Sequence, residues 1–334
     1  MTEGYDIIGD VHGCADKLEE LLVDLGYSIA PWSGAYYHPK RTAIFVGDLI
    51  DRGPSQLRVL EVVKAMVDEG TAQIVMGNHE FNALAYATKD PENPGEFLRP
   101  HNEKNARQHE AFLEQLTPEQ RTRYLEWFLT LPLWLDLGEL RVVHACWHQP
   151  SIDLIDRQLG GNSFKSLEDL IMAARSTKPA TPLYKAIEVV LKGPELDLEK
   201  YGAKAFQDKD KIRRSDARVR WWHGAATTLT DLAEVPGGSL DETGQPYGEL
   251  PEVLVDEGDR SFSYGGSVPV FYGHYWRAGE PVEHEDWTRT TACVDFSAVR
   301  GGTMVAYRWN GERQIDPLHY HPHGTDLINR KHSV

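Results

Sequence analysis

Short apolar runs alternate with periodic apolar patterns in the first third of the chain. The runs Tyr5–Ile8, Thr42–Val46 and Gln73–Met76 have the length of buried strands. The leucines behind the first run recur with helical spacing up to Gly26, and Pro54 has the position of a first helical residue behind the second run. Strands that alternate with helices predict an α/β fold whose functional groups lie at the carboxyl ends of the strands.

The remainder of the chain is less regular. The polar segment 88–110 predicts a loop, and a capping box at Thr117 predicts a helix that reaches Leu129. Two further helices are expected near 166–175 and 183–192. Strand-like runs return in four places: Leu140–Ala145, Val268–His274, Thr291–Phe296 and Thr303–Trp309. The last run alternates in the way that suits antiparallel pairing.

These patterns divide the chain into a core, an insertion and a tail. We expect residues 1–149 and 262–316 to form the core, and residues 150–261 to form an inserted cap that shapes specificity. Residues 317–334 are expected to be a mobile tail. The tail contains the run His319–His323 (HYHPH), which could bind a metal, although a solvated tail is the favoured interpretation.

Charge and cysteine content narrow the class of protein. With 35 Lys and Arg against 51 Asp and Glu, the formal charge is −16, which disfavours binding to nucleic acids and anionic membranes. The same field repels a phosphorylated substrate unless a strong local cation lies in the site. The three dispersed cysteines form no CxxC pair, and the chain has neither a signal-like start nor a membrane-length apolar run. These features predict a cytoplasmic protein.

Residue types that bind metals occur at the carboxyl ends of five of the strand-like runs or directly after them. The motifs are GDVHG (Gly9–Gly13), GDLIDRG (Gly47–Gly53), GNHE (Gly77–Glu80), VHA (Val143–Ala145) and GHY (Gly273–Tyr275). Because strand ends converge on one edge of an α/β sandwich, six side chains could meet there. They are Asp10, His12, Asp48, Asn78, His144 and His274.

Two carboxylates, one amide and three imidazoles suit borderline divalent ions such as Mn²⁺, Fe²⁺, Zn²⁺, Co²⁺ or Ni²⁺. Mg²⁺ or Ca²⁺ alone would prefer oxygen ligands only. Six ligands are too many for one ion that must keep an open position, but they suffice for two ions that share a bridging Asp. Two ions about 3.5–4 Å apart can clamp a phosphoryl group and hold a bridging hydroxide for in-line attack. Their charge would also offset the acidic surface.

The order of GDxHG, GDxxDRG and GNHE, followed by HA and GH, resembles the calcineurin-like metallophosphoesterases. More specifically, the chain resembles the phosphoprotein-phosphatase branch of this superfamily. That branch includes bacterial symmetrical diadenosine tetraphosphate hydrolases and Ser/Thr protein phosphatases. It covers residues 5–145 and about 268–309. The resemblance implies a four-layer α-β-β-α sandwich with the active site at the carboxyl ends of the strands, and two divalent ions, with Mn²⁺ as first choice.

The resemblance also implies a role for each motif residue. Asp10 and His12 would bind one metal, Asp48 would bridge, and the second metal would be bound by Asn78, His144 and His274. His79 would be the general acid, oriented by Asp51, and Arg52 and Asn78 would hold phosphate oxygens. The residue types alone lead to the same role for His79, because it is the histidine of the motifs that remains once the metal ligands are assigned. Glu80 is expected to support the loop.

One position departs from the superfamily pattern. Many metallophosphoesterases end in GHxH, whereas this chain has GHYW, so that Trp276 replaces a histidine ligand of the first metal. The phosphoprotein-phosphatase branch also lacks this histidine, which supports the narrower resemblance. Water or hydroxide would then complete the shell of the first ion.

Two other features stay open. In RVRWWHG (Arg218–Gly224), Arg218 or Arg220 could be a second phosphate clamp with a neighbouring Trp covering the metals, or the segment could be a strand with its tryptophans in the core. Cys146 follows His144 closely and could touch the site, but a packed, unreactive thiol is the default interpretation.

The sequence therefore predicts a hydrolase of phosphomonoesters or nucleotide polyphosphates, with a phosphorylated small molecule, nucleotide or phosphoprotein as substrate. One alternative is a phosphodiesterase acting on cyclic or nucleic acid phosphates, which the net charge and the missing second histidine disfavour. Another is a catalytically silent metal-binding regulator. His79, Asp51 and Arg52 argue against the regulator, because metal binding does not need them.

Overall fold

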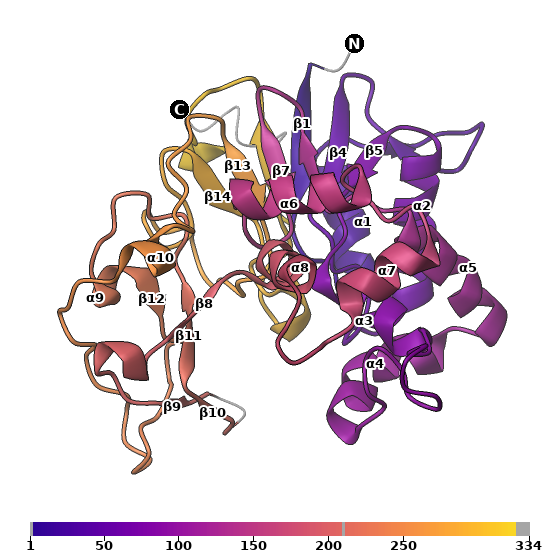
Figure 1. Ribbon diagram of the computed structural model, residues 1–334. Helices are drawn as coiled ribbons and strands as arrows, with labels where there is room; N and C mark the ends of the chain where they lie inside the picture. Colours follow the sequence, from indigo (N-terminus) through magenta and orange to yellow (C-terminus); the bar gives the residue numbers. More distant parts are fainter. Residues whose placement is uncertain (1–2, 209–210, 325–334) are drawn as a thin grey trace.

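Two β-sheets stacked face to face form the centre of the protein (Figure 1). The computed structural model describes residues 3–208 and 211–324. Within these residues, one sheet has five strands in the order β16-β15-β1-β4-β5, and the other has four strands in the order β14-β13-β7-β6. No helix in the described part of the chain is long and apolar enough to cross a membrane.

The first sheet joins strands from both ends of the described chain. β1 (Gly4–Ile8), β4 (Arg41–Phe45) and β5 (Ala72–Ile74) run parallel to one another. β15 (Val305–Trp309) pairs with β1 and with β16 (Tyr320–Pro322), and both pairings are antiparallel. The antiparallel arrangement expected for the last strand-like run is therefore confirmed.

The second sheet is formed by β6 (Trp134–Asp136), β7 (Arg141–Val143), β13 (Val270–Tyr272) and β14 (Thr291–Cys293). β13 runs parallel to β7 and β14, and β6 is antiparallel to β7. The chain thus leaves this sheet after β7 and returns to it about 130 residues later, with helices and the 195–262 segment between.

Each central strand supplies apolar side chains to two cores. Ile7 packs in the core between the sheets, whereas its neighbour Ile8 packs in the core beneath the helices. Val142 and Val143 on β7 are divided in the same way. Successive strand residues point to opposite faces, and a sheet buried on both faces therefore reads as a continuous apolar run. This explains the unbroken apolar character of the predicted strands.

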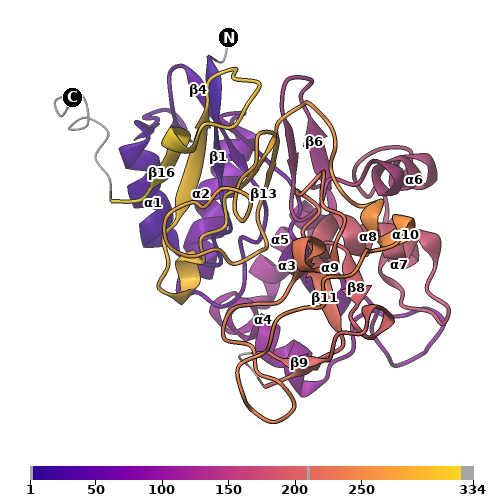
Figure 2. The same ribbon diagram turned by 90° about the vertical axis from the view of Figure 1, so that its left-hand side faces the viewer.

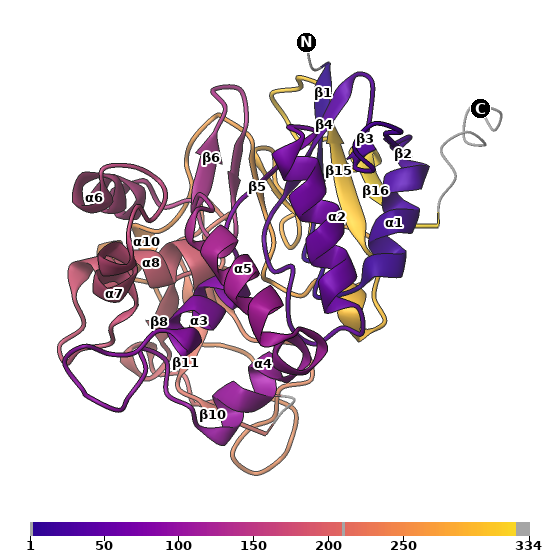
Figure 3. The ribbon, with the colours of Figure 1, turned by 90° about the vertical axis from the view of Figure 1, so that its right-hand side faces the viewer.

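Helices cover the outer face of each sheet (Figure 2). α1 (Ala15–Asp24) and α2 (Gln56–Asp68) lie on the first sheet (Figure 3). On the side of the second sheet lie α6 (Gln149–Leu159), α7 (Leu167–Ala174) and α8 (Pro182–Lys192). The predicted four-layer α-β-β-α sandwich is confirmed by this order of layers.

The helices beside α2 include one that the sequence did not predict. α5 (Pro118–Leu129) agrees with expectation and has the predicted capping box, and α3 (Asn78–Ala87) follows β5. The prediction of a loop over 88–110 is wrong from residue 103 onward, because α4 (Glu103–Gln115) begins there with the Asn102 side chain accepting from the Asn105 N–H. Most of α4 is polar, so it lacks the apolar stripe that reveals a helix.

The segment between α8 and β13 has small elements and an apolar cluster of its own. A three-stranded sheet consists of β8 (Glu195–Asp197), β11 (Asp216–Val219) and β12 (Ala233–Glu234). The cluster includes Leu196, Val219 and Leu232. The other small elements of the described chain are β2 (Ser28–Ile29), β3 (Tyr36–Tyr37), β9 (Phe206–Gln207), β10 (Arg213–Arg214), α9 (Leu229–Leu232), α10 (Glu257–Arg260), and three 3-10 helices, η1 (Glu199–Tyr201), η2 (Ala298–Arg300) and η3 (Pro317–His319).

The expected mobile tail is ordered as far as residue 324, so that prediction is wrong for this part. β16 adds a strand to the first sheet, with Tyr320 opposite Tyr307. His323 Nδ1 accepts the Met304 N–H at 3.1 Å, which fixes this histidine to the sheet. The HYHPH run is therefore part of the fold. The remainder of the expected tail, 325–334, lies outside the described residues.

A buried ion pair ties three strands of the first sheet together. Arg41 Nε donates to both carboxylate oxygens of Asp6, at 2.9 and 3.0 Å, and Asp6 is fully buried. Arg41 Nη2 donates to the carbonyl groups of Tyr5 and Trp309 at 2.7 and 2.8 Å. Burial raises the pKa of Asp6, and the guanidinium of Arg41 opposes this shift.

Replacement of Arg41 by Leu should lower the free energy of unfolding by about 3–5 kcal/mol, because the Asp6 carboxylate would stay buried without its principal partner. Urea denaturation of both proteins measures this difference. Lys64→Ala is the control: it breaks the exposed pair with Asp68, which should cost less than about 1 kcal/mol. Equal losses for the two variants would contradict the assigned role of Arg41.

Candidate metal centre

The predicted ligands gather at the carboxyl ends of the central strands. Asp10 and His12 follow β1, Asp48 follows β4, and Asn78 opens α3 directly behind β5. The second sheet contributes His144 behind β7 and His274 behind β13. All six are buried, and none exposes more than 7% of its surface. The sequence-predicted ligands are thus brought together from both sheets.

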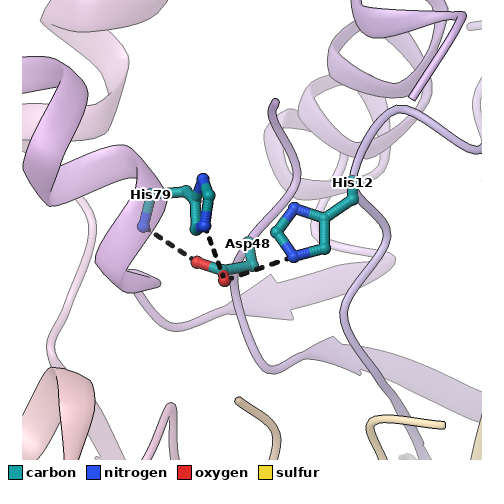
Figure 4. Close-up of side chains that lie close together, drawn as sticks. All are labelled: His12, Asp48 and His79. Atoms are coloured by element: carbon teal, nitrogen blue, oxygen red, sulfur yellow. Dashed lines mark hydrogen bonds and ion pairs between the residues drawn. The ribbon is translucent and has the colours of Figure 1, made fainter. Parts of the chain in front are cut away.

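The Asp48 carboxylate lies at the middle of the cluster (Figure 4). Its Oδ2 is 3.5 Å from His12 Nε2 and 3.8 Å from His79 Nε2. Its Oδ1 is 3.5 Å from His144 Nε2 and accepts the His79 backbone N–H at 2.9 Å. Imidazoles therefore face this carboxylate from several directions.

The cluster contains two sets of side chains with the geometry of metal sites. His12, Asp48 and His79 form one set, and Asp48, His144 and His274 form the other, with the ligand atoms of each set within 4.8 Å of one another. Asp48 belongs to both, as a bridging ligand would. His274 Nε2 is buried without a hydrogen-bond partner among the described residues. Mixed oxygen and nitrogen donors of this kind suit borderline divalent ions.

Asn78 and Asp10 complete the cluster in different ways. The Asn78 side-chain oxygen is 3.0 Å from His144 Nε2 and 2.8 Å from His274 Nδ1, so it faces the second set directly. Asp10 belongs to neither set, and its carboxylate accepts the His274 backbone N–H at 3.2 and 3.3 Å. Asp10 therefore connects the end of β1 to the end of β13.

The electrostatics of these buried groups also fit divalent cations. Burial raises the pKa of Asp48 to about 8 and raises the pKa of Asp10 well above its ordinary value. Burial lowers the pKa of His144 to about 4, and the other two predicted histidine ligands shift in the same direction. The imidazoles are therefore neutral and carry a lone pair, while the carboxylates need positive charge that a divalent cation would supply.

Backbone conformations that side chains normally avoid are concentrated here. Of the nine described non-glycine residues with positive φ, six lie in the motifs or next to them: His12, Asp48, Asp51, Arg52, His274 and Trp276. Such conformations cost about 1–3 kcal/mol each and persist where surrounding contacts enforce them. One enforcing contact comes from Glu80, whose carboxylate accepts the N–H groups of Asp48, Leu49, Ile50 and Gly77. Glu80 thus supports the loop, as expected.

His79 is oriented by a second chain of contacts. Its Nδ1 lies 2.5 Å from Asp51 Oδ2, and the same carboxylate oxygen is 2.9 Å from His109 Nδ1. His109 lies on α4 and is 1% exposed. His109 was not among the predicted site residues, because it falls in the segment predicted as a loop, outside every motif.

Asp295 is a second residue that the sequence analysis missed. It is 3% exposed, and its charge contributes to the raised pKa of Asp10 and of Asp48. Asp295 Oδ2 accepts the Trp276 N–H at 2.8 Å, and Oδ1 accepts the Ser297 N–H at 3.0 Å. Its only sequence signal is its position three residues after Ala292, near the end of a predicted strand.

The remaining candidate residues fall into different surroundings. Arg52 is exposed and its Nη1 reaches His12 Nε2 at 2.5 Å, next to the cluster. Arg218 lines a cavity that also contains Arg52, whereas Arg220 lines another cavity. Trp221 and Trp222 are core residues, in agreement with the structural interpretation of RVRWWHG. Cys146 is fully buried and its pKa is raised by burial, as a packed thiol requires.

The two-sheet sandwich with Asp, Asn and His at one edge defines a phosphoesterase of the metal-dependent kind. Residues 5–204 match the calcineurin-like phosphoesterase family, which is more than half of the chain, and the chain belongs to this family. The family predicted from the GDxHG, GDxxDRG and GNHE motifs is therefore confirmed, and with it the class of hydrolases acting on phosphate esters or anhydrides.

The individual relatives include nucleotide hydrolases. The chain is 34% identical over 143 residues to the asymmetrical bis(5'-nucleosyl)-tetraphosphatase PrpE of Oceanobacillus iheyensis, covering 42% of this chain and 54% of that protein. It is 36% identical over 148 residues to PrpE of Bacillus subtilis, covering 42% and 57%. The chain thus spans about half the length of these relatives. A protein serine/threonine phosphatase structure from Saccharomyces cerevisiae is 14% identical, covering 96% of this chain and 79% of that chain, with a TM-score of 0.44.

Gly273→Ala should weaken the binding of a divalent cation roughly 10–100-fold, the range seen when residues that support metal ligands are changed. A Cβ at this position would lie 2.0 Å from Asp10 Oδ1 and would displace that carboxylate. Calorimetric titration of the metal-free protein with Mn²⁺ measures the effect. Gly248→Ala is the matched control, because a Cβ there meets no atom within 4 Å. Unchanged affinity in Gly273→Ala would contradict the proximity of Asp10 to the metals.

Proposed function

We propose that this protein is a dinuclear metal-dependent phosphoesterase that hydrolyses phosphomonoesters or nucleotide polyphosphates. The observation that carries this proposal is the position of Asp48 in two ligand sets at once. His79 lies beside Asp48 and is not a member of the second set. The names of the PrpE relatives support nucleotide polyphosphates as one substrate class. Mn²⁺ is the ion that we expect in the active protein.

The ligand residues would divide between the two ions. Asp10, His12 and Asp48 would hold one ion, and Asp48, Asn78, His144 and His274 would hold the other. Ions bound there would polarise a phosphoryl oxygen and lower the pKa of water. Asp48 gives both sites the same carboxylate, and the backbone N–H of His79 fixes the orientation of that carboxylate.

His79 is the proposed proton donor. In hydrolysis the oxygen of water forms a new P–O bond, the bond to the leaving oxygen breaks, and the leaving oxygen takes up a proton. Asp51 would hold the Nδ1–H of His79, so that the other ring nitrogen, Nε2, faces Asp48 and the substrate. Burial lowers the pKa of His79, and the negative charge of a bound phosphate would favour the protonated ring.

Arg52 is the proposed phosphate-binding residue. Its guanidinium reaches His12 Nε2 and lies over the Trp276 ring, with its central carbon 4.1 Å from the ring centroid. The planar fork of an arginine matches two oxygens of one phosphate. Arg52 would therefore hold the substrate against the metals, while Asn78 would contact it from the side of the second ion.

Metal-stripped protein should hydrolyse p-nitrophenyl phosphate or diadenosine tetraphosphate only after Mn²⁺ is restored, since the buried donors supply no electrophile of their own. Asp48→Asn should lower kcat/KM at least about a hundredfold, because it weakens both sites. Asp68→Asn, an exposed change on α2, is the control and should retain full activity. A chromogenic phosphodiester is measured in parallel, and a preference for it would favour the phosphodiesterase alternative.

His79→Gln should lower kcat about 10²–10⁴-fold, the usual contribution of a general acid, while two ions per chain remain bound. Turnover and metal content by mass spectrometry are measured on the same sample. His101→Gln changes an exposed histidine and should alter neither quantity. Loss of a metal ion in His79→Gln would instead identify His79 as a ligand of the His12–Asp48 set, and unchanged turnover would contradict the proton-donor role.

A further inference from the structure

A cavity of about 680 Å³ adjoins the metal centre. It is lined by Arg52, Tyr275, Trp276 and Arg300, and by the acidic side chains Glu285 and Asp286. The 195–262 segment contributes Arg218 and the acidic side chains Glu195, Asp208, Asp216 and Glu234. Its volume lies in the range of small-molecule sites, and it exceeds the space that a single phosphate needs.

Two guanidinium groups are held at one indole ring in this cavity. The central carbon of Arg52 lies 4.1 Å from the centroid of Trp276, and that of Arg300 lies 4.3 Å from it. These distances limit the separation of the two guanidinium carbons to 8.4 Å at most. Contact with an aromatic ring fixes a flexible arginine without neutralising its charge. The two cations therefore lie beside one indole ring, whose centroid is 5.9 Å from that of His12.

The turn that carries Arg300 is fixed from two sides. Asp295 accepts N–H groups from both Trp276 and Ser297, which joins the Trp276 loop to this turn. From the other side, Lys17 Nζ donates to the carbonyl groups of Ala298 and Gly302 at 2.7 Å each. These contacts fix the backbone that presents Arg300.

The two arginines at Trp276 and the neighbouring Arg218 form no close ion pair with an acidic side chain. Among residues 3–208 and 211–324, neither Arg52, Arg218 nor Arg300 has a carboxylate oxygen within 4.0 Å. In the same cavity Arg277 pairs with Glu234 and Asp286. Six acidic side chains also line the cavity, but these three arginines have no close carboxylate among the described residues, so their guanidinium groups are available to an anionic ligand.

We propose that Arg300 and Trp276 form a second phosphate subsite, which binds the phosphate next to the one that is hydrolysed. This inference rests on the proposed function and makes it narrower. The site then favours phosphoanhydride chains, as in inorganic polyphosphates and nucleoside polyphosphates, over isolated phosphomonoesters. The remainder of the cavity accommodates the continuation of the chain.

The leaving group explains why an additional arginine at this position selects anhydrides. When water attacks a terminal phosphorus of such a chain, the bridging P–O bond breaks and the departing oxygen belongs to a phosphate. The negative charge on this phosphate increases as the bond breaks, and a guanidinium beside it stabilises that charge. An alcohol that leaves from a phosphomonoester has no phosphate for Arg300 to bind.

The test compares kcat/KM for inorganic tripolyphosphate with kcat/KM for p-nitrophenyl phosphate in the Mn²⁺-loaded protein. Arg300→Gln should lower the ratio of these two constants roughly ten- to a hundredfold, which corresponds to one charge-assisted hydrogen bond. Arg300→Lys should restore part of the ratio, because it keeps the charge but loses the planar fork. Arg123→Gln, an exposed arginine on α5, is the matched control and should leave the ratio unchanged.

An unchanged ratio in Arg300→Gln would overturn the proposal, whether the variant keeps both activities or loses them equally. If the wild-type protein hydrolyses neither substrate, the proposed function fails and binding decides the question of the subsite. Calorimetry then compares tripolyphosphate with orthophosphate as ligands of the Mn²⁺-loaded protein. Arg300→Gln must weaken tripolyphosphate binding at least about tenfold more than orthophosphate binding; a smaller difference would overturn the subsite as well.

Discussion

Asp10, Asp48 and Asp295 place three carboxylates in a space from which water is excluded. Burial raises the pKa of Asp10 and of Asp48, and the nearby charge of Asp295 raises both pKa values further. Backbone N–H groups of His79 and His274 offset part of this cost. The neutral imidazoles around Asp48 offer lone pairs and no positive charge. Divalent cations are the partners that such a combination lacks. The same buried carboxylates therefore create the need for positive charge at this edge of the sheets and supply the ligands for metal chemistry.

The cluster also depends on the packing of the two sheets. Asp48 belongs to the first sheet, and His144 and His274 belong to the second, so the core between the sheets sets the spacing of the ligands. Backbones approach closely at this edge, and a Cβ on Gly9 would lie 1.9 Å from the carbonyl oxygen of Val294. The glycine that opens GDVHG is therefore required by sheet packing. Asp10 and His12 in the same motif are required by chemistry instead.

The sequence was sufficient for features that depend on local patterns. Strand-like apolar runs and the motifs behind them predicted the sandwich and brought Asp48 and His144 to one edge, because side chains at strand ends share a position whatever the details of the loops. His109 was not predictable in this way, since its contact with Asp51 depends on the docking of a polar helix. Asp295 and β16 likewise depend on tertiary pairing, which leaves little periodic signal in a short segment.

The central strand of the first sheet pairs on one side with β4 and on the other with β15, which lies about 300 residues later in the chain. During synthesis, β1, β4 and β5 can associate early, but the free edge of β1 remains without its neighbour until residues 305–309 have left the ribosome. An exposed apolar edge is prone to pair with other chains. The time between the synthesis of the first and the last strand is therefore the interval in which this protein is most exposed to misassembly, and chaperones that cover strand edges would act within it.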